Sequence, residues 1–213
     1  LISNYTTAQI AVMSTAQIAA LTTEDWAAFS TAQIAALTGT QIPAIATSGL
    51  RVLGTSQFAA FQPADVSAFT ASQVQAFATN QLQAMSSAQI GAFVPTQVQA
   101  LSTTQLRAID SGDYAGLSTT AVAALSSAQL GSLATAQISA LESNQVAALS
   151  TTALRGLATN QIGALGTADI VAMSSSQIGS LSTTQLARLS TAQVQAIESA
   201  DLGALSTSAV AAL

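Results

Sequence analysis

An eight-residue period constrains the fold of this chain more than any other feature of its sequence. Counted from Tyr5, 26 octads follow one another without an insertion or a deletion, and Leu213 opens one more. Positions 1 and 6 of the octad are large and apolar throughout. Position 3 is Thr or Ser in 22 octads, position 5 is Gln in 17 and Asp in 5, and position 8 is Ala in 19. A fixed period of this kind is typical of folds that stack similar units, so the chain is expected to be a repeat array.

The spacing within the octad favours a short helix. Position 6 and the next position 1 are three residues apart, as in Trp26 and Phe29, and a helical turn places such residues on one face. Ser or Thr at position 2 with Gln at position 5, as in Ser30 and Gln33, matches the capping box that begins many helices. Pro63 would then be the first helical residue, where proline is tolerated. We expect a helix over positions 3 to 8 or the next position 1, after a corner at positions 1 and 2.

One continuous helix does not fit the period. Eight residues at about 100° each make about 800°, so the apolar stripe would rotate by roughly 80° per octad. A corner in every octad removes this drift. The prediction is therefore an all-α solenoid of short, one- to two-turn helices, one per octad, forming a single continuous array over residues 1–213. Pro43 at position 7 lacks a helical N–H donor and suggests that some helices are 3₁₀. A β-solenoid is the alternative.

The period also assigns the core. Positions 1 and 6 are expected to be buried, and positions 4 and 7, which vary most, are expected to face solvent. A lone octad has too little apolar surface to fold, so stability must be shared along the array. All nine aromatic residues stand at position 1 or 6 and are assigned to the core: Tyr5, Trp26, Phe29, Phe58, Phe61, Phe69, Phe77, Phe93 and Tyr114.

Composition argues against most functional classes. The chain has no His, no Lys and no Cys, so serine has no usual base beside it and thiolate metal sites are excluded. We expect no catalytic residue, no enzyme activity and no cofactor. A net charge of −5 without a basic cluster predicts no nucleic-acid partner. Apolar runs are far shorter than the roughly 20 residues of a membrane-spanning helix, so no membrane span is expected.

The carboxylates are the only candidate metal ligands. Five aspartates replace glutamine at position 5, near the start of the expected helix, where negative charge is favourable: Asp25, Asp65, Asp113, Asp169 and Asp201. The pairs Asp110–Asp113 and Glu198–Asp201 repeat one spacing, but neither lies in a loop with the Asp and Gly density of a calcium site. We therefore predict no metal site.

The hydroxyl side chains at position 3 are the most regular polar feature. Turn and cap chemistry repeated in every octad would account for them. Glycan modification of these Ser and Thr residues, or an ordered hydroxyl surface, is the functional alternative. Asn4-Tyr5-Thr6 is the sole N-glycosylation sequon, which makes Asn4 the one candidate site for that modification.

Octads such as STAQIAAL, TTAQIAVM, STTQLARL and STAQVQAI resemble the L-[ST]-T-x-Q-[IV]-x-A repeat arrays of large bacterial secreted and surface proteins of adhesin-like type. The resemblance covers essentially the whole chain and implies an extracellular or cell-surface location. It implies a structural repeat protein: a rigid spacer, stalk or filament-forming segment without catalysis. The alternative is a binding solenoid that presents a Thr/Ser ladder to a glycan, a peptide or a crystal surface such as ice. We expect the array to continue in further octads or to associate head-to-tail with itself.

Overall fold

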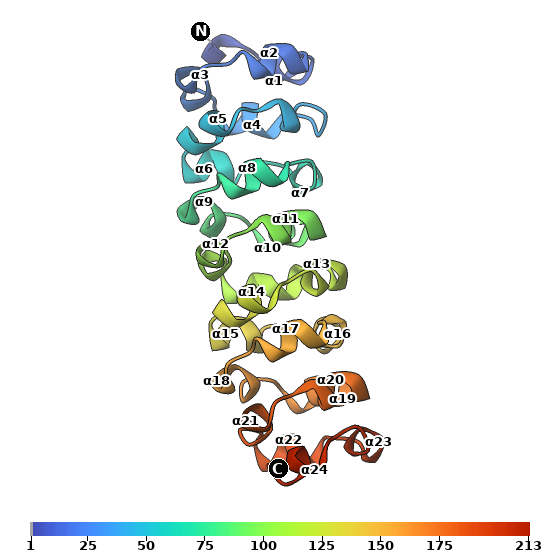
Figure 1. Ribbon diagram of the computed structural model, residues 1–213. Coiled ribbons are helices and arrows are strands. Elements are labelled where there is room, and N and C mark those ends of the chain that lie inside the picture. The colour runs from blue at the N-terminus through green and yellow to red at the C-terminus, as the bar shows by residue number, and fades with distance from the viewer. Residues whose placement is uncertain (1) are drawn as a thin grey trace. The chain divides into compact units, whose positions relative to one another are not determined.

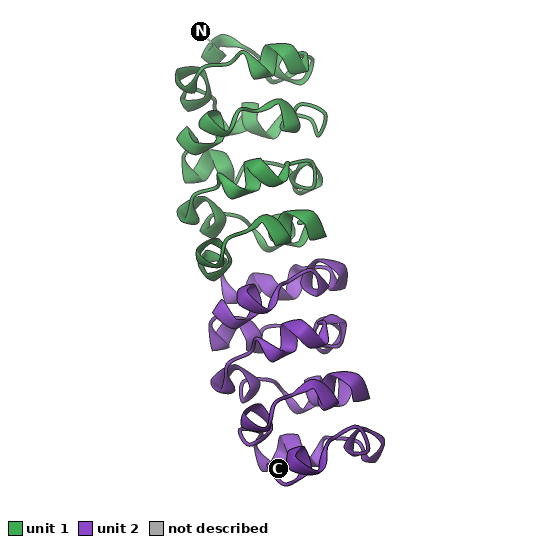
Figure 2. Cartoon of the chain, in the orientation of Figure 1, with its two compact units in different colours: residues 1–109 green, residues 110–213 purple. Residues whose placement is uncertain are grey.

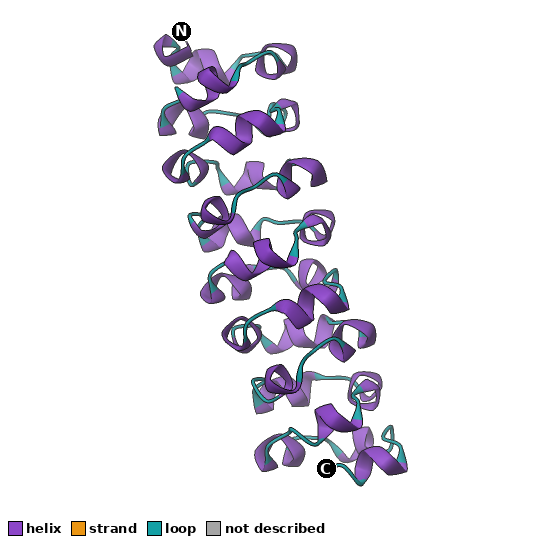
Figure 3. Ribbon diagram, turned by 60° about the vertical axis from the view of Figure 1, so that its left-hand side comes forward, coloured by secondary structure: helices purple, strands orange, loops and turns teal. Residues whose placement is uncertain are grey.

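A computed structural model describes residues 2–213, and all regular structure in that range is helical (Figure 3). The chain divides into two compact units, residues 1–109 and 110–213 (Figure 2). The octad phase continues through the boundary between them without an insertion. A single continuous array over residues 1–213 stays a prediction, and every contact described below lies within one unit.

Unit 1 consists of short α-helices with two 3₁₀ helices, which carry the label η. They are η1 (Ile2–Asn4), α1 (Thr7–Ala11), α2 (Thr15–Ala19), α3 (Thr23–Ala27), α4 (Thr31–Ala35), η2 (Ile42–Ala44), α5 (Thr47–Val52), α6 (Thr55–Phe58), α7 (Pro63–Val66), α8 (Ala71–Gln75), α9 (Thr79–Gln83), α10 (Ser87–Gly91), α11 (Pro95–Ala100) and α12 (Thr103–Ala108).

Unit 2 repeats the same plan. Its elements are η3 (Ser111–Gly116), α13 (Thr119–Ala123), α14 (Ser127–Ser132), α15 (Thr135–Ser139), α16 (Ser143–Ala148), α17 (Thr151–Arg155), α18 (Thr159–Ile162), α19 (Thr167–Ala172), α20 (Ser175–Ser180), α21 (Thr183–Leu186), α22 (Thr191–Gln195), α23 (Ser199–Leu202) and α24 (Thr207–Val210).

The helix begins at position 3, as predicted, in every octad except that of Pro43, and it ends between positions 6 and 8. In α12, Ser102 at position 2 is the N-cap with φ −69° and ψ 160°, and its hydroxyl accepts from the backbone N–H of Gln105 at 3.2 Å. The preceding helix, α11, ends at Ala100, and its C-cap, Leu101 at position 1, is extended. Two extended residues thus form the corner, and no described residue has a positive φ. The prediction of an all-α solenoid of short helices is confirmed. The β-solenoid alternative is not supported, because residues 2–213 contain no strand.

Successive turns stack within each unit (Figure 1). Within a unit, helices pack against the helix three octads later, as α1 does against α4 and α13 against α16. Side chains at position 5 reach carbonyls 28 and 31 residues earlier, which belong to the corner between two octads of the preceding turn. One turn therefore takes between three and four octads. A helix in one turn lies partly over a corner in the turn before it.

The core follows the predicted rows. Position 6 is buried from Ile10 to Leu186, and position 4 is exposed in every octad. Position 7 is exposed as well, apart from three half-buried residues, Ala35, Gly91 and Gly131. Eight of the nine aromatic residues are buried, which confirms their assignment to the core.

Tyr5 is the exception among the aromatic residues, because 46% of it is exposed and the prediction that it is buried is wrong. Met13 and Leu21, at position 1 of the following octads, are half-buried. At the other end of the described chain it is position 6 that is exposed, as in Val210 at 50%. The side chain at position 1 therefore faces the preceding turn, and the side chain at position 6 faces the following turn. Tyr5 is exposed because no complete turn before it is described.

Pro43 has the predicted effect on its octad. The residues around it form the 3₁₀ helix η2, in which the backbone N–H of Ala44 and of Ile45 bond to the carbonyls three residues earlier, those of Gln41 and Ile42. Proline has no N–H with which to continue an α-helical ladder, so the tighter helix is formed instead.

Candidate functional site

The most regular chemical feature of both units is the side chain at position 5, which connects two helices in successive turns. In α16, Gln145 Oε1 accepts from the backbone N–H of Glu142 at 2.7 Å and so caps the N-terminus of its own helix. Its Nε2 donates to the carbonyls of Tyr114 and Leu117 at 2.9 and 2.6 Å. Those carbonyls lie at the C-terminal end of η3, where the Tyr114 carbonyl also accepts from the backbone N–H of Leu117 and the last acceptors of a helix lack further helical donors. One amide thus caps two helix ends.

The same contact recurs through each unit. The glutamines that donate in this way to carbonyls of the preceding turn are Gln33, Gln41, Gln57, Gln73, Gln81, Gln89, Gln97, Gln105, Gln145, Gln161, Gln177, Gln185 and Gln193. Most of their side chains are buried. Because a buried amide group must be hydrogen-bonded, this ladder both requires and stabilises the stacking of turns.

Glutamine is the residue that this position needs. A glutamate has no donor for the two carbonyls, and an asparagine is one methylene shorter. The sequence predicted the capping half of the contact but not the donor half. That half depends on the number of octads per turn, which the period alone does not give.

Aspartate at position 5 makes a different contact. Asp169 Oδ2 accepts from the backbone N–H of Gly166 at 2.7 Å, which is the cap expected from its place near the helix N-terminus. Its Oδ1 accepts from the hydroxyl of Ser143, 26 residues earlier, at 2.8 Å. Asp201 accepts from Ser175 in the same way, again 26 residues earlier. Both aspartates are buried, with 7% exposed.

Asp65 has a related partner without a hydroxyl. Burial raises the pKa of its carboxyl group, and a hydrogen bond from the backbone N–H of Gly39 partly opposes that rise. Gly39 stands at position 3, three octads before Asp65, as the two serines do before their aspartates. A Cβ atom added to Gly39 would lie 3.4 Å from Asp65 Oδ1. Position 3 therefore lies directly against the carboxylate of the next turn.

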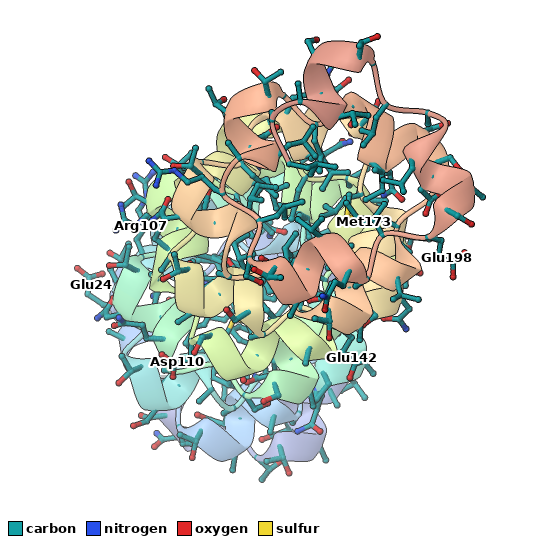
Figure 4. The ribbon with its side chains drawn as sticks, turned by 90° about the horizontal axis from the view of Figure 1, so that it is seen from below. Glu24, Arg107, Asp110, Glu142, Met173 and Glu198 are labelled. Carbon is teal, nitrogen blue, oxygen red and sulfur yellow. The ribbon has the colours of Figure 1, made fainter. Side chains whose placement is uncertain are left out.

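The acidic pairs proposed as candidate metal ligands are not gathered into a larger cluster. Asp110 and Glu198 are exposed on the outside of unit 2 (Figure 4), whereas Asp113 is half-buried and Asp201 is buried against Ser175. Across residues 2–213, no three His, Cys, Asp or Glu side chains form a group that could hold a metal ion.

The hydroxyl groups at position 3 were expected to form turns and caps, but they do not cap the helices. Capping is done by position 2, and the position-3 residue is the first residue of the helix, as Thr103 is in α12. Thr103 is exposed, as are most of its equivalents. Asn4, the candidate for N-glycosylation, is exposed as well, at the end of η1.

Unit 1 has two further features, a hollow and a buried indole group. The hollow, of about 420 Å³, lies between α4, the corner Ala59–Pro63 and Gln89. The amide of Gln89 is already bonded to the carbonyls of Ala59 and Phe61. The indole N–H of Trp26 is buried without a hydrogen-bond partner. Neither feature gathers the several convergent polar groups of a ligand site.

The fold and the glutamine ladder define a helical repeat solenoid. Five overlapping segments match the ALTTAQ repeat: residues 58–95, 71–103, 106–143, 138–173 and 162–196. Together they cover more than half of the chain, which therefore belongs to the ALTTAQ repeat family. This bears out the octad array inferred from the sequence. No curated protein matches the chain. No helix in the described residues is long and apolar enough to cross a membrane.

Proposed function

We propose that this chain is a structural repeat segment, a spacer or stalk without catalytic activity of its own. The observation that carries the proposal is the glutamine ladder. In octad after octad the buried polar side chain joins one turn to the next, and positions 1 and 6 fill the space between the turns. A segment built in this way gains length and stability by repetition.

The proposal is tested by lengthening the chain. Seven further octads, copied from residues 133–188, would be inserted after Arg188 in unit 2, and the maximum dimension of the protein would be measured by small-angle X-ray scattering. Seven octads form about two turns, and helix layers pack 8–10 Å apart, so an increase of about 16–20 Å is expected. An unchanged maximum dimension would contradict a spacer function.

The location and partners belong to the same proposal. The resemblance to bacterial surface arrays supports an extracellular or cell-surface location. The glutamine contact between turns recurs along each unit, which supports association with further octads, whether of the same chain or of a second copy. Secretion of the chain with its native flanking sequence, followed by fractionation, tests the location. Analytical ultracentrifugation over a range of concentrations tests self-association.

A second candidate function is a binding solenoid. The exposed hydroxyls at position 3, such as Thr103 and Thr183, favour it, and they are also the candidate sites of glycan modification. The overlap of helices with corners in successive turns works against a dense flat lattice, because equal positions do not lie directly above one another. Thr103→Val and Thr183→Val would abolish adsorption to a glycan or ice surface if this function were correct and would leave a spacer unaffected.

A further inference from the structure

The glutamine contact is alike in every turn, so it does not distinguish one octad from another. The aspartate contacts do. In each one described, a position-5 carboxylate meets the position-3 residue 26 positions earlier: Gly39 with Asp65, Ser143 with Asp169 and Ser175 with Asp201.

The sequence has a matching rule at this spacing. Threonine occupies 16 of the 26 third positions. Of the 15 glutamines at position 5 that have a position-3 residue at this spacing before them, 12 have threonine there. Four aspartates at position 5 also have a position-3 residue at this spacing before them, and in no case is it threonine. These residues are Gly39, Ser87, Ser143 and Ser175. Residue choice at position 3 thus follows the choice at position 5 three octads later.

The contacts give a physical reason for this rule. Gln145 and Asp169 each use one oxygen to cap their own helix, but glutamine directs its amide nitrogen to the carbonyls of the corner. Aspartate directs its second oxygen to position 3, and this buried oxygen needs a donor. The serine hydroxyl provides it in the Ser143–Asp169 and Ser175–Asp201 pairs, and beside Asp65 the backbone N–H of Gly39 lowers the pKa of the carboxyl group. Threonine also has a hydroxyl, but its χ1 angle is restricted, and its methyl group would be added where a Cβ atom is already in van der Waals contact with the carboxylate, at 3.4 Å in the Gly39–Asp65 pair.

We propose that these matched pairs are recognition elements, which specify the octads that pack together in successive turns. The glutamine ladder and the apolar rows stabilise stacking of any octad on any other. The aspartate pairs favour one partner, because a serine or glycine at the correct distance meets the carboxylate without the added methyl group of threonine.

The test moves a pair to a new place. Gln177 has threonine, Thr151, at the place that corresponds to Ser143 in the Ser143–Asp169 pair. Gln177→Asp removes the donor to Leu149 and leaves an oxygen without a partner, so it is expected to lower stability in urea denaturation. Adding Thr151→Ser is expected to raise the folding equilibrium constant of that variant about tenfold, which is within the usual range of coupling between contacting residues. Thr151→Ser alone is the control for the serine itself.

Thr159→Ser is the matched control for distance, because Thr159 also stands at position 3 but belongs to the octad after that of Thr151. It is expected to give Gln177→Asp no recovery. Equal recovery by both serines, or recovery by neither, would overturn the proposal. If Gln177→Asp does not fold, the reverse exchange decides the matter. Ser143→Thr is then expected to destabilise the natural chain but not the Asp169→Gln variant, and additive effects of these two substitutions would overturn the proposal.

Discussion

The amide of a position-5 glutamine is both a donor and an acceptor, and the fold uses both. The acceptor satisfies an N–H at the start of its own helix and the donor satisfies carbonyls at the end of another, as in Gln145. The short helices have few internal hydrogen bonds, so most of their end groups need such partners. One glutamine side chain thus supplies hydrogen-bond partners for the end groups of two short helices.

Gln145→Glu separates the two functions of this side chain. The capping oxygen remains, but the donor to Tyr114 and Leu117 is replaced by a second oxygen that faces their carbonyls. We expect a loss of about 3 kcal/mol in the free energy of unfolding, because a buried charged group is left without a donor. Gln9→Glu is the control, since exposed Gln9 caps Thr6 in the same way. It should change stability by less than about 0.5 kcal/mol. Equal losses in urea denaturation would contradict the donor function.

Asp65 should give a distinct pH dependence of stability. Burial raises the pKa of its carboxyl group above the ordinary value of about 4. Between the unfolded and the folded pKa the native state holds more protons, so stability falls as pH rises through this window and is higher below it. Asp65→Asn, which does not titrate, should lack this component. Denaturation of both proteins from pH 3 to pH 7 measures it, and a wild-type component that rises with pH would be contrary to the expectation.

The elements themselves are shorter than helices that persist in water on their own, so caps and packing decide where they form. Proline shows this clearly. Pro43 lies late in its octad and forces a 3₁₀ helix, whereas Pro63 is the first residue of α7 and costs no hydrogen bond.

Replacing each proline by alanine should therefore have opposite effects. Pro43→Ala restores an N–H and is expected to raise the free energy of unfolding by about 1 kcal/mol. Pro63→Ala gains no bond and increases the entropy of the unfolded chain, so it should lower stability by about 0.5 kcal/mol. The urea midpoints of the two variants measure this difference. Changes of the same sign would show that position within the octad is unimportant.

Packing between α3 and α5 depends on two residues that differ from the usual ones of the octad, Trp26 at position 6 and Gly49 at position 5. Trp26 is fully buried, and a Cβ atom on Gly49 would overlap with its Cδ1 atom. Gly49 stands where glutamine is usual, because the indole fills the space of that side chain. Gly49→Gln should lower the free energy of unfolding by about 2–3 kcal/mol in the natural chain. In the Trp26→Ile background the same change restores the usual residues and should stabilise. Thermal denaturation of the natural chain, the two single variants and the double variant measures these changes in stability. Additive effects of the two substitutions would contradict direct packing of Trp26 against Gly49.

The sequence predicted the helices and the buried rows because both depend on residues close together in the chain. Ser102 and Gln105 cap one helix within a single octad, and that contact is visible in the period. The donor contact of Gln105 with Val74 and Phe77 was not predictable, since it needs the number of octads per turn. The Ser143–Asp169 pair left a signal in the sequence, the absence of threonine before aspartate. That signal has meaning only once the spacing between turns is known.

At the scale of the whole molecule, the octad is the unit of construction and the turn is not. Because one turn takes between three and four octads, each octad meets the parts of two others in the turn before it. Removing one octad therefore leaves every later octad in an equivalent place, with new but similar partners. The apolar rows and the glutamine ladder tolerate this change. The aspartate pairs do not tolerate it, because they depend on particular residues at a particular distance.

Deletion of single octads tests this view. Removing residues 149–156 shortens the separation of Asp169 from Ser143 by one octad and opposes Asp169 to Thr135, whereas removing the similar octad 117–124 crosses none of the aspartate pairs. Both shortened chains should fold. The first should be less stable than the second by about 1–3 kcal/mol in urea denaturation, the range for a buried acceptor left without its donor. Thr135→Ser in the first deletion should recover most of the difference, because it returns a serine to the required distance. If both deletions fail to fold, the equivalence of octads is wrong, and if both are equally stable, the aspartate pairs do not select their partners.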